Sequence, residues 1–409
     1  MIADHIDSGR TSTADGRAER APRVRASQRS DVPPFHAMRV FEAAAARRAG
    51  GHPVFNLSAG QPSTRAPRAV LAAAHRALDA ELLGYTVSLG IPELRTAIAV
   101  HYRRTYGLQI DPSRVVATTG SSGGFLLAFL SAFDPGARVA LARPGYPAYR
   151  NMLTALGCEV VELACGAETG YQPTVAVLDA LDPRPDGLVL ASPANPTGTM
   201  VAPSDLAAIV TWCRDHDVRL ISDEIYHGIT YTQAAASAWE TDRGGIVVNS
   251  FSKYFSMTGW RLGWLLLPDG LLDRVDRLAT NLALCPPTLA QHAAVHAFDD
   301  YAELDANVAR YRDNRRLLLD GLRGLGLTRL APADGGFYAY VDVSDHCTDS
   351  MTLCYRMLAE TGVATAPGLD FDPDQGHRFL RFSFAGDAVE IADALDALQN
   401  WLLRHGPAR

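Results

Sequence analysis

The chain has 409 residues, of which 47% are hydrophobic and 20% charged, and it carries a formal net charge of −7 at pH 7. This length allows one large and one small domain, and the composition is typical of a globular enzyme. The negative charge excludes a general electrostatic attraction to nucleic acid or anionic membranes, and no apolar run is long enough to span a bilayer. We therefore expect neither nucleic acid nor a membrane among its partners.

The cysteines and the first residues bear on the compartment. Six cysteines are spread along the chain without a C-x-x-C pair: Cys158, Cys165, Cys213, Cys285, Cys347 and Cys354. That spacing predicts free thiols in a reducing cytoplasm and no metal site. Residues 1–31 lack the apolar segment of a secretory signal and contain too many acidic residues for an organelle-import leader, so we expect a disordered tail.

From residue 115 to residue 267 strands alternate with helices. Apolar spacing predicts helices at 35–49, 67–80, 91–106, 125–133, 149–156 and 203–216. Short apolar runs predict strands at 54–58, 115–118, 139–142, 160–163, 187–191, 219–222, 245–249 and 264–267. This alternation predicts an α/β layer with a mostly parallel sheet.

After residue 271 the pattern changes to long helices and a smaller α+β part. Helices are expected at 271–284, 288–299, 301–323, 350–360 and 387–404, and strands at 337–343 and 378–384. The domains expected from these patterns are a tail at 1–31, an N-terminal segment at 32–66 that packs on the small domain, a large domain at 67–305 and a small domain at 306–409.

One residue stands out by composition. Lys253 is the only lysine among 38 lysines and arginines. Arginine serves well in ion pairs but cannot replace a lysine whose neutral amine attacks a carbonyl. Lys253 therefore indicates amine chemistry such as a Schiff base, although composition alone also allows a surface lysine left by chance. The nearby hydroxyls of Ser250 and Ser252 and the cation of Arg261 favour a phosphorylated aldehyde cofactor.

Here the chain resembles a known family. The segment 250–263, S-F-S-K-Y-F-S-M-T-G-W-R-L-G, resembles the cofactor-lysine signature of the class I/II aminotransferases, which use pyridoxal 5'-phosphate. The segment 192–198, S-P-A-N-P-T-G, resembles a second family motif. The resemblance covers roughly residue 35 to the C-terminus. It implies fold type I: a large, mostly parallel-sheet α/β/α domain and a smaller α+β domain.

A turn of small residues predicts where the cofactor phosphate binds. The segment 120–123, G-S-S-G, lies between a strand and a helix, where free N–H groups favour an anion. Taken alone, any strand-to-helix turn could have this composition. In the family, Ser121 and Ser122 match phosphate-binding positions together with Ser250 and Arg261.

Other residues are assigned to the cofactor ring. Asp223 follows a strand and could keep a pyridine nitrogen protonated, although a loop-capping aspartate is the alternative. Tyr226 and Asn195 match donors to the phenolic oxygen of the cofactor. Tyr146 matches an aromatic residue that stacks on the ring, with an ordinary core tyrosine as the alternative.

The remaining matches concern the substrate and a second subunit. Arg381 matches the arginine that holds the α-carboxylate of the substrate. Gly60 and Asn195 match further positions beside the substrate. Arg378 is the competing arginine, but the alternation of side chains along a strand puts it on the face opposite to Arg381. Tyr85 matches a tyrosine that reaches the phosphate of the neighbouring subunit, which implies a homodimer with shared active sites.

The resemblance implies an aminotransferase that moves an amino group between an L-amino acid and a 2-oxo acid by a ping-pong mechanism. Lys253, Asp223 and Tyr226 are the expected catalytic residues. No residue matches the extra cation of dicarboxylate-specific relatives, and the segment 281–288 is apolar, which favours neutral or aromatic substrates. A β-lyase, synthase, decarboxylase or oxidase on the same fold stays open, as does a non-catalytic sensor, which would need a DNA-binding domain.

Overall fold

The computed structural model describes residues 25–405. The predicted tail at 1–31 therefore lies mostly outside the described residues, and residues 25–31 are exposed around the short 3-10 helix η1 (Gln28–Ser30). Within residues 25–405, no helix is both long and apolar enough to cross a membrane.

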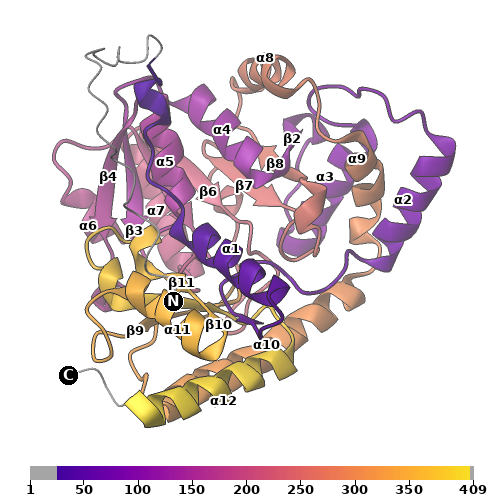
Figure 1. The fold of residues 1–409 in the computed structure, drawn as a ribbon. Coiled ribbons are helices and arrows are strands. Elements are labelled where there is room, and N and C mark those ends of the chain that lie inside the picture. Colours follow the sequence, from indigo (N-terminus) through magenta and orange to yellow (C-terminus); the bar gives the residue numbers. More distant parts are fainter. Residues whose placement is uncertain (1–24, 406–409) are drawn as a thin grey trace, which may run out of the picture.

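A seven-stranded sheet forms the centre of the molecule (Figure 1). Its strands are β2 (Val115–Thr118), β3 (Arg138–Arg143), β4 (Glu159–Ala164), β5 (Gly187–Ala191), β6 (Arg219–Asp223), β7 (Ile246–Ser250) and β8 (Gly263–Leu266). Their order is β2-β8-β7-β6-β5-β3-β4, and only β8 runs antiparallel to its neighbours. The prediction of a mostly parallel sheet is thus confirmed.

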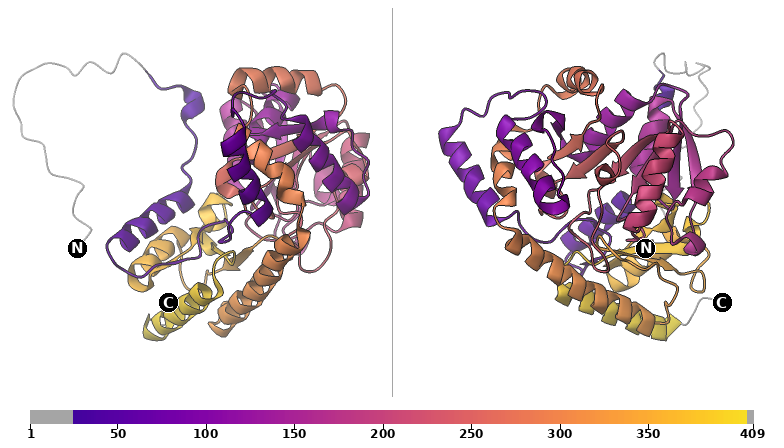
Figure 2. Two further views of the ribbon diagram at one scale, coloured as in Figure 1. Left: turned by 90° about the vertical axis from the view of Figure 1, so that its right-hand side faces the viewer. Right: turned by 180° about the vertical axis from the view of Figure 1, so that it is seen from behind.

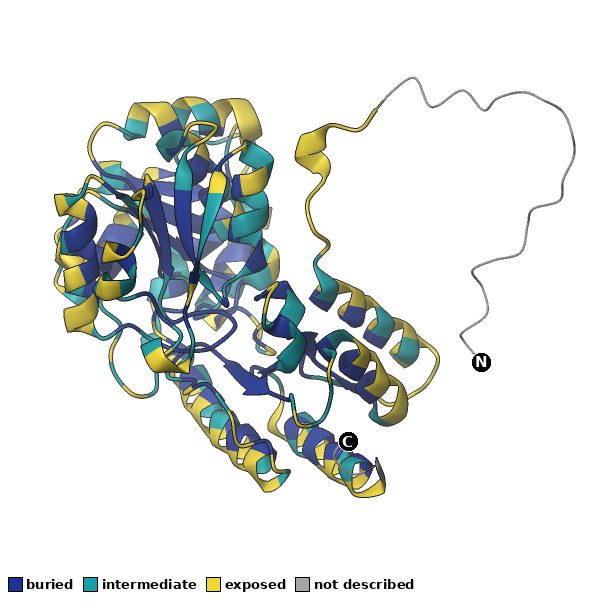
Figure 3. Cartoon of the chain, turned by 90° about the vertical axis from the view of Figure 1, so that its left-hand side faces the viewer, coloured by how far each residue is buried: buried dark blue, intermediate teal, exposed yellow. Residues whose placement is uncertain are grey.

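Helices cover both faces of this sheet. The helices of this part of the chain are α2 (Arg68–Ala80), α3 (Pro92–Tyr106), α4 (Gly120–Ala132), α5 (Pro147–Leu156), α6 (Val175–Asp179), α7 (Pro203–Asp215), α8 (Leu272–Ala283) and α9 (Thr288–Ala294), and among them α2 packs on α9 beside the sheet. Val189 and Ile221 pack with α4, α5 and α8 on one face. Leu188 and Leu220 pack with α6 and α7 on the other, so the central strands carry apolar side chains on both sides. Figure 3 shows that these strands are largely buried.

The C-terminal part is built on two long helices and a small sheet. Its elements are α10 (Tyr301–Gly324), β9 (Tyr338–Asp342), α11 (Ser350–Thr361), β10 (Val363–Ala364), β11 (Ala366–Pro367), β12 (Phe379–Ser383) and α12 (Ala388–His405). Strands β11, β12 and β9 form an antiparallel sheet in that order. Helices α10 and α12 lie side by side (Figures 1 and 2).

The first helix and strand lie beside this C-terminal part. They are α1 (His36–Ala49) and β1 (Phe55–Asn56), and β1 pairs with β10. Asp370 caps α1, since its carboxylate accepts from the backbone N–H of His36 at 2.8 Å and of Ala37 at 2.7 Å. A carboxylate at the N-terminus of a helix is favoured by the free N–H groups and the helix dipole.

Short 3-10 helices complete the chain, and two predicted helices differ from the structure. The 3-10 helices are η2 (Pro112–Arg114), η3 (Ala167–Thr169), η4 (Ala238–Glu240), η5 (Thr258–Trp260), η6 (Val295–Phe298), η7 (Gly368–Asp370) and η8 (Gly376–Arg378). The helix expected at 288–299 ends as α9 at Ala294 and continues as η6. The helix expected at 125–133 begins at Gly120 as α4, so the predicted small-residue turn is its first turn.

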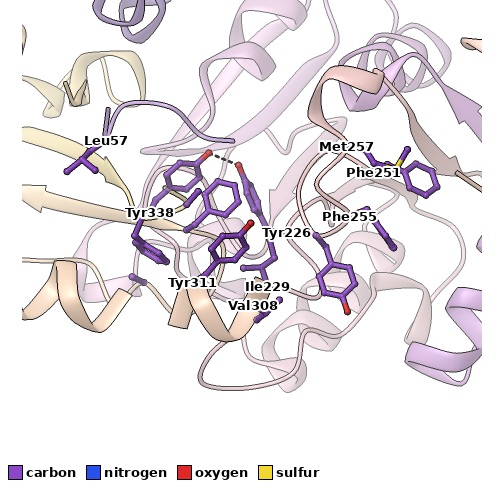
Figure 4. Packing of buried hydrophobic residues seen from close by; sticks show 14 of the residues in the cluster. Leu57, Tyr226, Ile229, Phe251, Phe255, Met257, Val308, Tyr311 and Tyr338 are labelled. Carbon is purple, nitrogen blue, oxygen red and sulfur yellow. Dashed lines mark hydrogen bonds between the residues drawn. The ribbon is translucent and has the colours of Figure 1, made fainter. Parts of the chain in front are cut away.

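A buried aromatic cluster joins the central sheet to the C-terminal part (Figure 4). Tyr226 follows β6, Phe251 and Phe255 flank Lys253, and Tyr338 lies on β9. These side chains come from distant parts of the chain. The Tyr226 ring contacts the Tyr338 ring and so holds the segment after β6 against β9, whereas Phe251 and Phe255 pack on Trp264 of β8.

Candidate active site

A cavity of about 350 Å³ lies at the carboxyl ends of the central strands, where ligands bind in open α/β sheets. All but two of the predicted site residues line it: Gly60, Ser121, Ser122, Tyr146, Asn195, Asp223, Tyr226, Lys253, Arg261 and Arg381. These positions span more than three hundred residues of sequence, so tertiary structure brings them together.

Lys253 projects into the cavity from the segment after β7. Its Nζ donates to the carbonyl oxygen of Gly60 at 2.6 Å and lies 5.6 Å from the ring centre of Tyr226. Burial lowers the pKa of Lys253 to about 8, and the nearby charge of Arg381 acts in the same direction, whereas Asp223 opposes both. About a tenth of this amine is therefore neutral at pH 7, and the neutral fraction rises with pH.

Gly60 marks the opposite wall, and it faces a residue that the sequence analysis missed. A Cβ at Gly60 would lie 2.0 Å from the Tyr338 hydroxyl, so only glycine fits. That hydroxyl lies 2.8 Å from the hydroxyl of Tyr226 (Figure 4). Tyr338 shares a face of the small sheet with Arg381, because Arg381 pairs with Tyr340 across β12 and β9.

Asp223 is the last residue of β6 and is buried beneath the cavity. Its Oδ1 accepts from the Ile225 N–H at 3.0 Å, and its Oδ2 accepts from the Tyr149 hydroxyl. Burial raises the pKa of Asp223 to about 6, while these two hydrogen bonds and the charge of Lys253 lower it. The site therefore holds a carboxylate whose charge depends on its donors.

Arg381 occupies the substrate side. Its guanidinium donates to Asn195 Oδ1 and to the Ser58 carbonyl oxygen, each at 2.8 Å, and lies 4.3 Å from the Tyr338 ring centre. The Arg381 Nε is buried and has no hydrogen-bond partner among the described residues. In contrast, Arg378 lies outside the cavity and donates to Asp342 at 3.1 Å.

The other end of the cavity suits an anion. Arg261 donates to the Thr258 carbonyl oxygen at 3.0 Å and lies over the first turn of α4. A Cβ at Gly120 would lie 2.6 Å from the Arg261 guanidinium, which explains the glycine at that position. The side chains of Ser121 and Ser122 face the cavity beside the free N–H groups of the same turn.

Three further predicted positions are Tyr146 at the cavity, Ser250 behind its wall and Tyr85 outside it. Tyr146 lines the cavity, and burial raises its pKa. Ser250 is buried behind the cavity wall with its hydroxyl 2.9 Å from that of Ser252, and it is Ser252 that reaches the cavity. Tyr85 is 85% exposed and outside the cavity, so any role for it requires a second subunit.

Thiols and metal ligands play no part in this geometry. All six cysteines are free. Among residues 25–405, no group of three or more histidine, cysteine, aspartate or glutamate side chains could hold a metal ion. The chemistry of the cavity therefore centres on an amine, a buried carboxylate and two arginines.

The comparison with known families agrees with this arrangement. The family model for aminotransferase class I and II matches residues 52–398, and the chain belongs to this family. The protein is accordingly a transaminase that depends on pyridoxal 5'-phosphate. The predicted family, cofactor and reaction class are confirmed, and transamination takes precedence over the lyase, synthase, oxidase and sensor alternatives.

Individual relatives support the same assignment. The chain is 57% identical over 382 residues to the valine–pyruvate aminotransferase of Mycobacterium tuberculosis, covering 92% of this chain and 98% of the relative. It is 35% identical over 346 residues to the aspartate/prephenate aminotransferase of Thermus thermophilus, covering 83% and 89%. A crystal structure of a Mycobacterium tuberculosis aminotransferase superposes with a TM-score of 0.92 at 56% identity, covering 93% of this chain and 100% of that one.

Proposed function

We propose that this transaminase acts on neutral amino acids, with L-valine and pyruvate as the pair to test first. The observation that carries this proposal is the charge of the cavity: its cations among the described residues are Lys253, Arg261 and Arg381. A dicarboxylate would need a further cation for its side chain. The cavity rim instead carries apolar side chains such as Met38 and Phe41 of α1. A relative that is 57% identical is named for valine and pyruvate.

A substrate panel tests this proposal. We expect kcat/KM for L-valine with pyruvate to exceed that for L-aspartate by at least about 100-fold, because an unpaired buried carboxylate costs several kcal/mol. L-Phenylalanine tests the aromatic branch of the prediction. The variant Met38→Arg should raise the relative rate with aspartate, whereas the uncharged control Met38→Gln should not. Equal or faster turnover of aspartate by the wild type would contradict the proposal.

We propose that the phosphate end of the cofactor binds at Arg261, Ser121, Ser122 and Ser250. The fit rests on the donors at the first turn of α4 and on Gly120, which leaves room for the Arg261 guanidinium. Ser250 would act from behind Ser252, to which its hydroxyl is close. Lys253, which lines the same cavity, would carry the cofactor aldehyde.

We assign the ring of the cofactor to four residues. Asp223 would hold a proton on the ring nitrogen, and Tyr146 would stack on the ring face. The hydroxyl of Tyr226 and the amide nitrogen of Asn195 would donate to the phenolic oxygen, since Asn195 Oδ1 already accepts from Arg381. When bound, the cofactor supplies an electron sink for the electron pair left at the substrate Cα.

The protein's own residues would bind the substrate and move its proton. Arg381 would orient the α-carboxylate through its unused N–H groups, including the partnerless Nε. Gly60 borders the substrate, and its carbonyl oxygen positions the Lys253 amine. With a pKa of about 8, Lys253 Nζ can accept the proton from the amino acid's Cα near neutral pH.

We propose further that the active unit is a homodimer. Leu82 is 97% exposed, Tyr85 85% and Leu284 50%. They lie on adjoining segments, because the Thr288 hydroxyl donates to the Gly84 carbonyl oxygen at 2.6 Å. Apolar side chains exposed together suggest a surface that another copy covers. Tyr85 would then reach the phosphate of the partner subunit.

Subunit mixing tests the shared site. Tyr85→Phe and Lys253→Ala chains should each be impaired as homodimers, and mixing them should restore one site in which both residues are intact. A fully active monomer, or a mixture no more active than its components, would contradict the shared site.

We also propose the domain division and the compartment predicted above. A boundary at residues 305–306 falls inside α10, and the pairing of β1 with β10 favours placing residues 32–66 on the C-terminal domain. The free cysteines are compatible with a cytoplasmic location.

A further inference from the structure

The first turn of α5 brings two tyrosines to the active site. Tyr146 is the residue before the helix and Tyr149 lies three positions later, so both point to the same side. The Tyr149 ring is buried, with its centre 4.9 Å from that of Phe125 and 5.3 Å from that of Tyr146. This packing directs the Tyr149 hydroxyl to Asp223 Oδ2, to which it donates.

Asp223 depends on few donors. Its Oδ1 is paired with the Ile225 N–H, so the Tyr149 hydroxyl is the side-chain donor that holds Oδ2. The other ionisable groups around Asp223 are Lys253, after β7, and the hydroxyls of Tyr146 and Tyr226. A buried carboxylate stays ionised only where donors or opposite charges offset its desolvation.

We propose that Tyr149 is a positioning residue that keeps Asp223 ionised and aimed at the ring nitrogen of the bound cofactor. The inference rests on the proposed role of Asp223. Because burial and the neighbouring Asp223 charge raise the pKa of Tyr149 well above its ordinary value, its hydroxyl stays protonated and remains a donor throughout the working pH range. The same helix turn thereby places one tyrosine on the cofactor ring and the other on the carboxylate that serves it.

The chain offers a matched control for removing a buried hydroxyl. The Tyr340 hydroxyl is buried without a partner among the described residues, and its ring stacks on Phe379 with centres 4.7 Å apart. Tyr340→Phe therefore makes the same substitution at another buried tyrosine, away from Asp223 and without loss of a hydrogen bond. An effect that comes only from the loss of a buried hydroxyl group would appear in both variants.

Two measurements on the holoenzyme test the inference. In Tyr149→Phe the pKa of Asp223 should rise, so the acidic limb of the plot of kcat/KM against pH should move to higher pH. The expected displacement is about one to two pH units, which corresponds to the free energy of one hydrogen bond to a charged group. The dissociation constant of the cofactor, measured by equilibrium dialysis, should rise about tenfold or more for the same reason. Tyr340→Phe should leave both quantities unchanged.

A double-mutant cycle separates this inference from the role of Asp223 itself. In an Asp223→Asn background, Tyr149→Phe should change the cofactor dissociation constant by less than about twofold, because the carboxylate through which it acts is gone. If Asp223→Asn is impaired but Tyr149→Phe leaves the acidic limb and cofactor affinity unchanged, or if the two effects add, the inference is overturned. If Asp223→Asn equals the wild type, the role of Asp223 fails and the inference falls with it.

A second variant guards against loss of folding in Tyr149→Phe. Tyr149→His keeps a ring N–H donor and should keep the acidic limb near the wild-type position. A limb that moves as far as in Tyr149→Phe would show that donation to Asp223 is not what matters, and would overturn the proposal.

Discussion

Replacing Arg381 with lysine separates charge from geometry at the substrate end of the cavity. The Arg381 guanidinium is buried, holds Asn195 and the Ser58 carbonyl oxygen, and leaves its Nε free for a carboxylate. Lysine keeps the charge but not the planar fork. Losing one hydrogen bond between charged groups costs about 1.5–3 kcal/mol, so kcat/KM for the amino acid should fall about 10- to 150-fold.

Arg378 provides the matched control, since Arg378→Lys makes the same substitution three residues away. Its side chain is 43% exposed and pairs with Asp342, and such surface pairs contribute about 0–1 kcal/mol. Steady-state kinetics with a range of amino acid concentrations should therefore show a large loss in Arg381→Lys and less than about a fivefold change in Arg378→Lys. Equal losses in the two variants would refute the assignment of Arg381 to the substrate carboxylate.

Three other predictions concern the surroundings of the site. Gly60→Ala should lower kcat/KM about 5- to 150-fold, because the new methyl group must displace the buried Tyr338 hydroxyl at a cost of about 1–3 kcal/mol; wild-type kinetics would contradict the close approach. Burial raises the pKa of Glu224 from 4.5 to about 8, so unfolding releases a proton between these pH values, and the free energy of unfolding should fall as pH rises through this range. Denaturant titrations should show a smaller fall in Glu224→Gln. The same pH dependence of the free energy of unfolding in both proteins would argue against a protonated Glu224. Cofactor-depleted protein should bind pyridoxal phosphate faster as pH rises through about 8, because the Lys253 amine loses its proton there. A binding rate that does not change with pH, measured by stopped-flow absorbance, would exclude this titration.

Lys253 and Asp223 could be proposed from their chemistry and position in the sequence, whereas Asn195, Tyr226 and Arg381 were assigned by resemblance to the family. Carboxyl ends of parallel strands meet at one edge of a sheet, so Asp223, expected at the end of a strand, was a candidate site residue, and its strand lies beside the one that precedes Asn195. Lys253 was recognisable because no other residue type can carry its chemistry. Each of these inferences needs only local pattern and the direction of a strand.

Other features depend on contacts that no local pattern contains. Tyr338 reaches the site because β9 pairs with β12 in a particular register, and that register is not visible in either strand alone. The sequence around Tyr149 predicted only the start of a helix, because its partner Asp223 lies 74 residues later in the chain. The first turn of α4 was predicted as a turn outside the helix, because glycine has a low helix propensity. Glycine is needed at Gly120 because the Arg261 guanidinium lies close to it.

The most direct test of transamination at Lys253 is a half-reaction. Holoenzyme mixed with L-valine, without any acceptor, should release one 2-oxo acid per Lys253 and then stop until pyruvate is added, because a ping-pong transaminase must return the amino group before it can act again. Lys253→Ala should release none. Continued formation of oxo acid without an acceptor would contradict transamination.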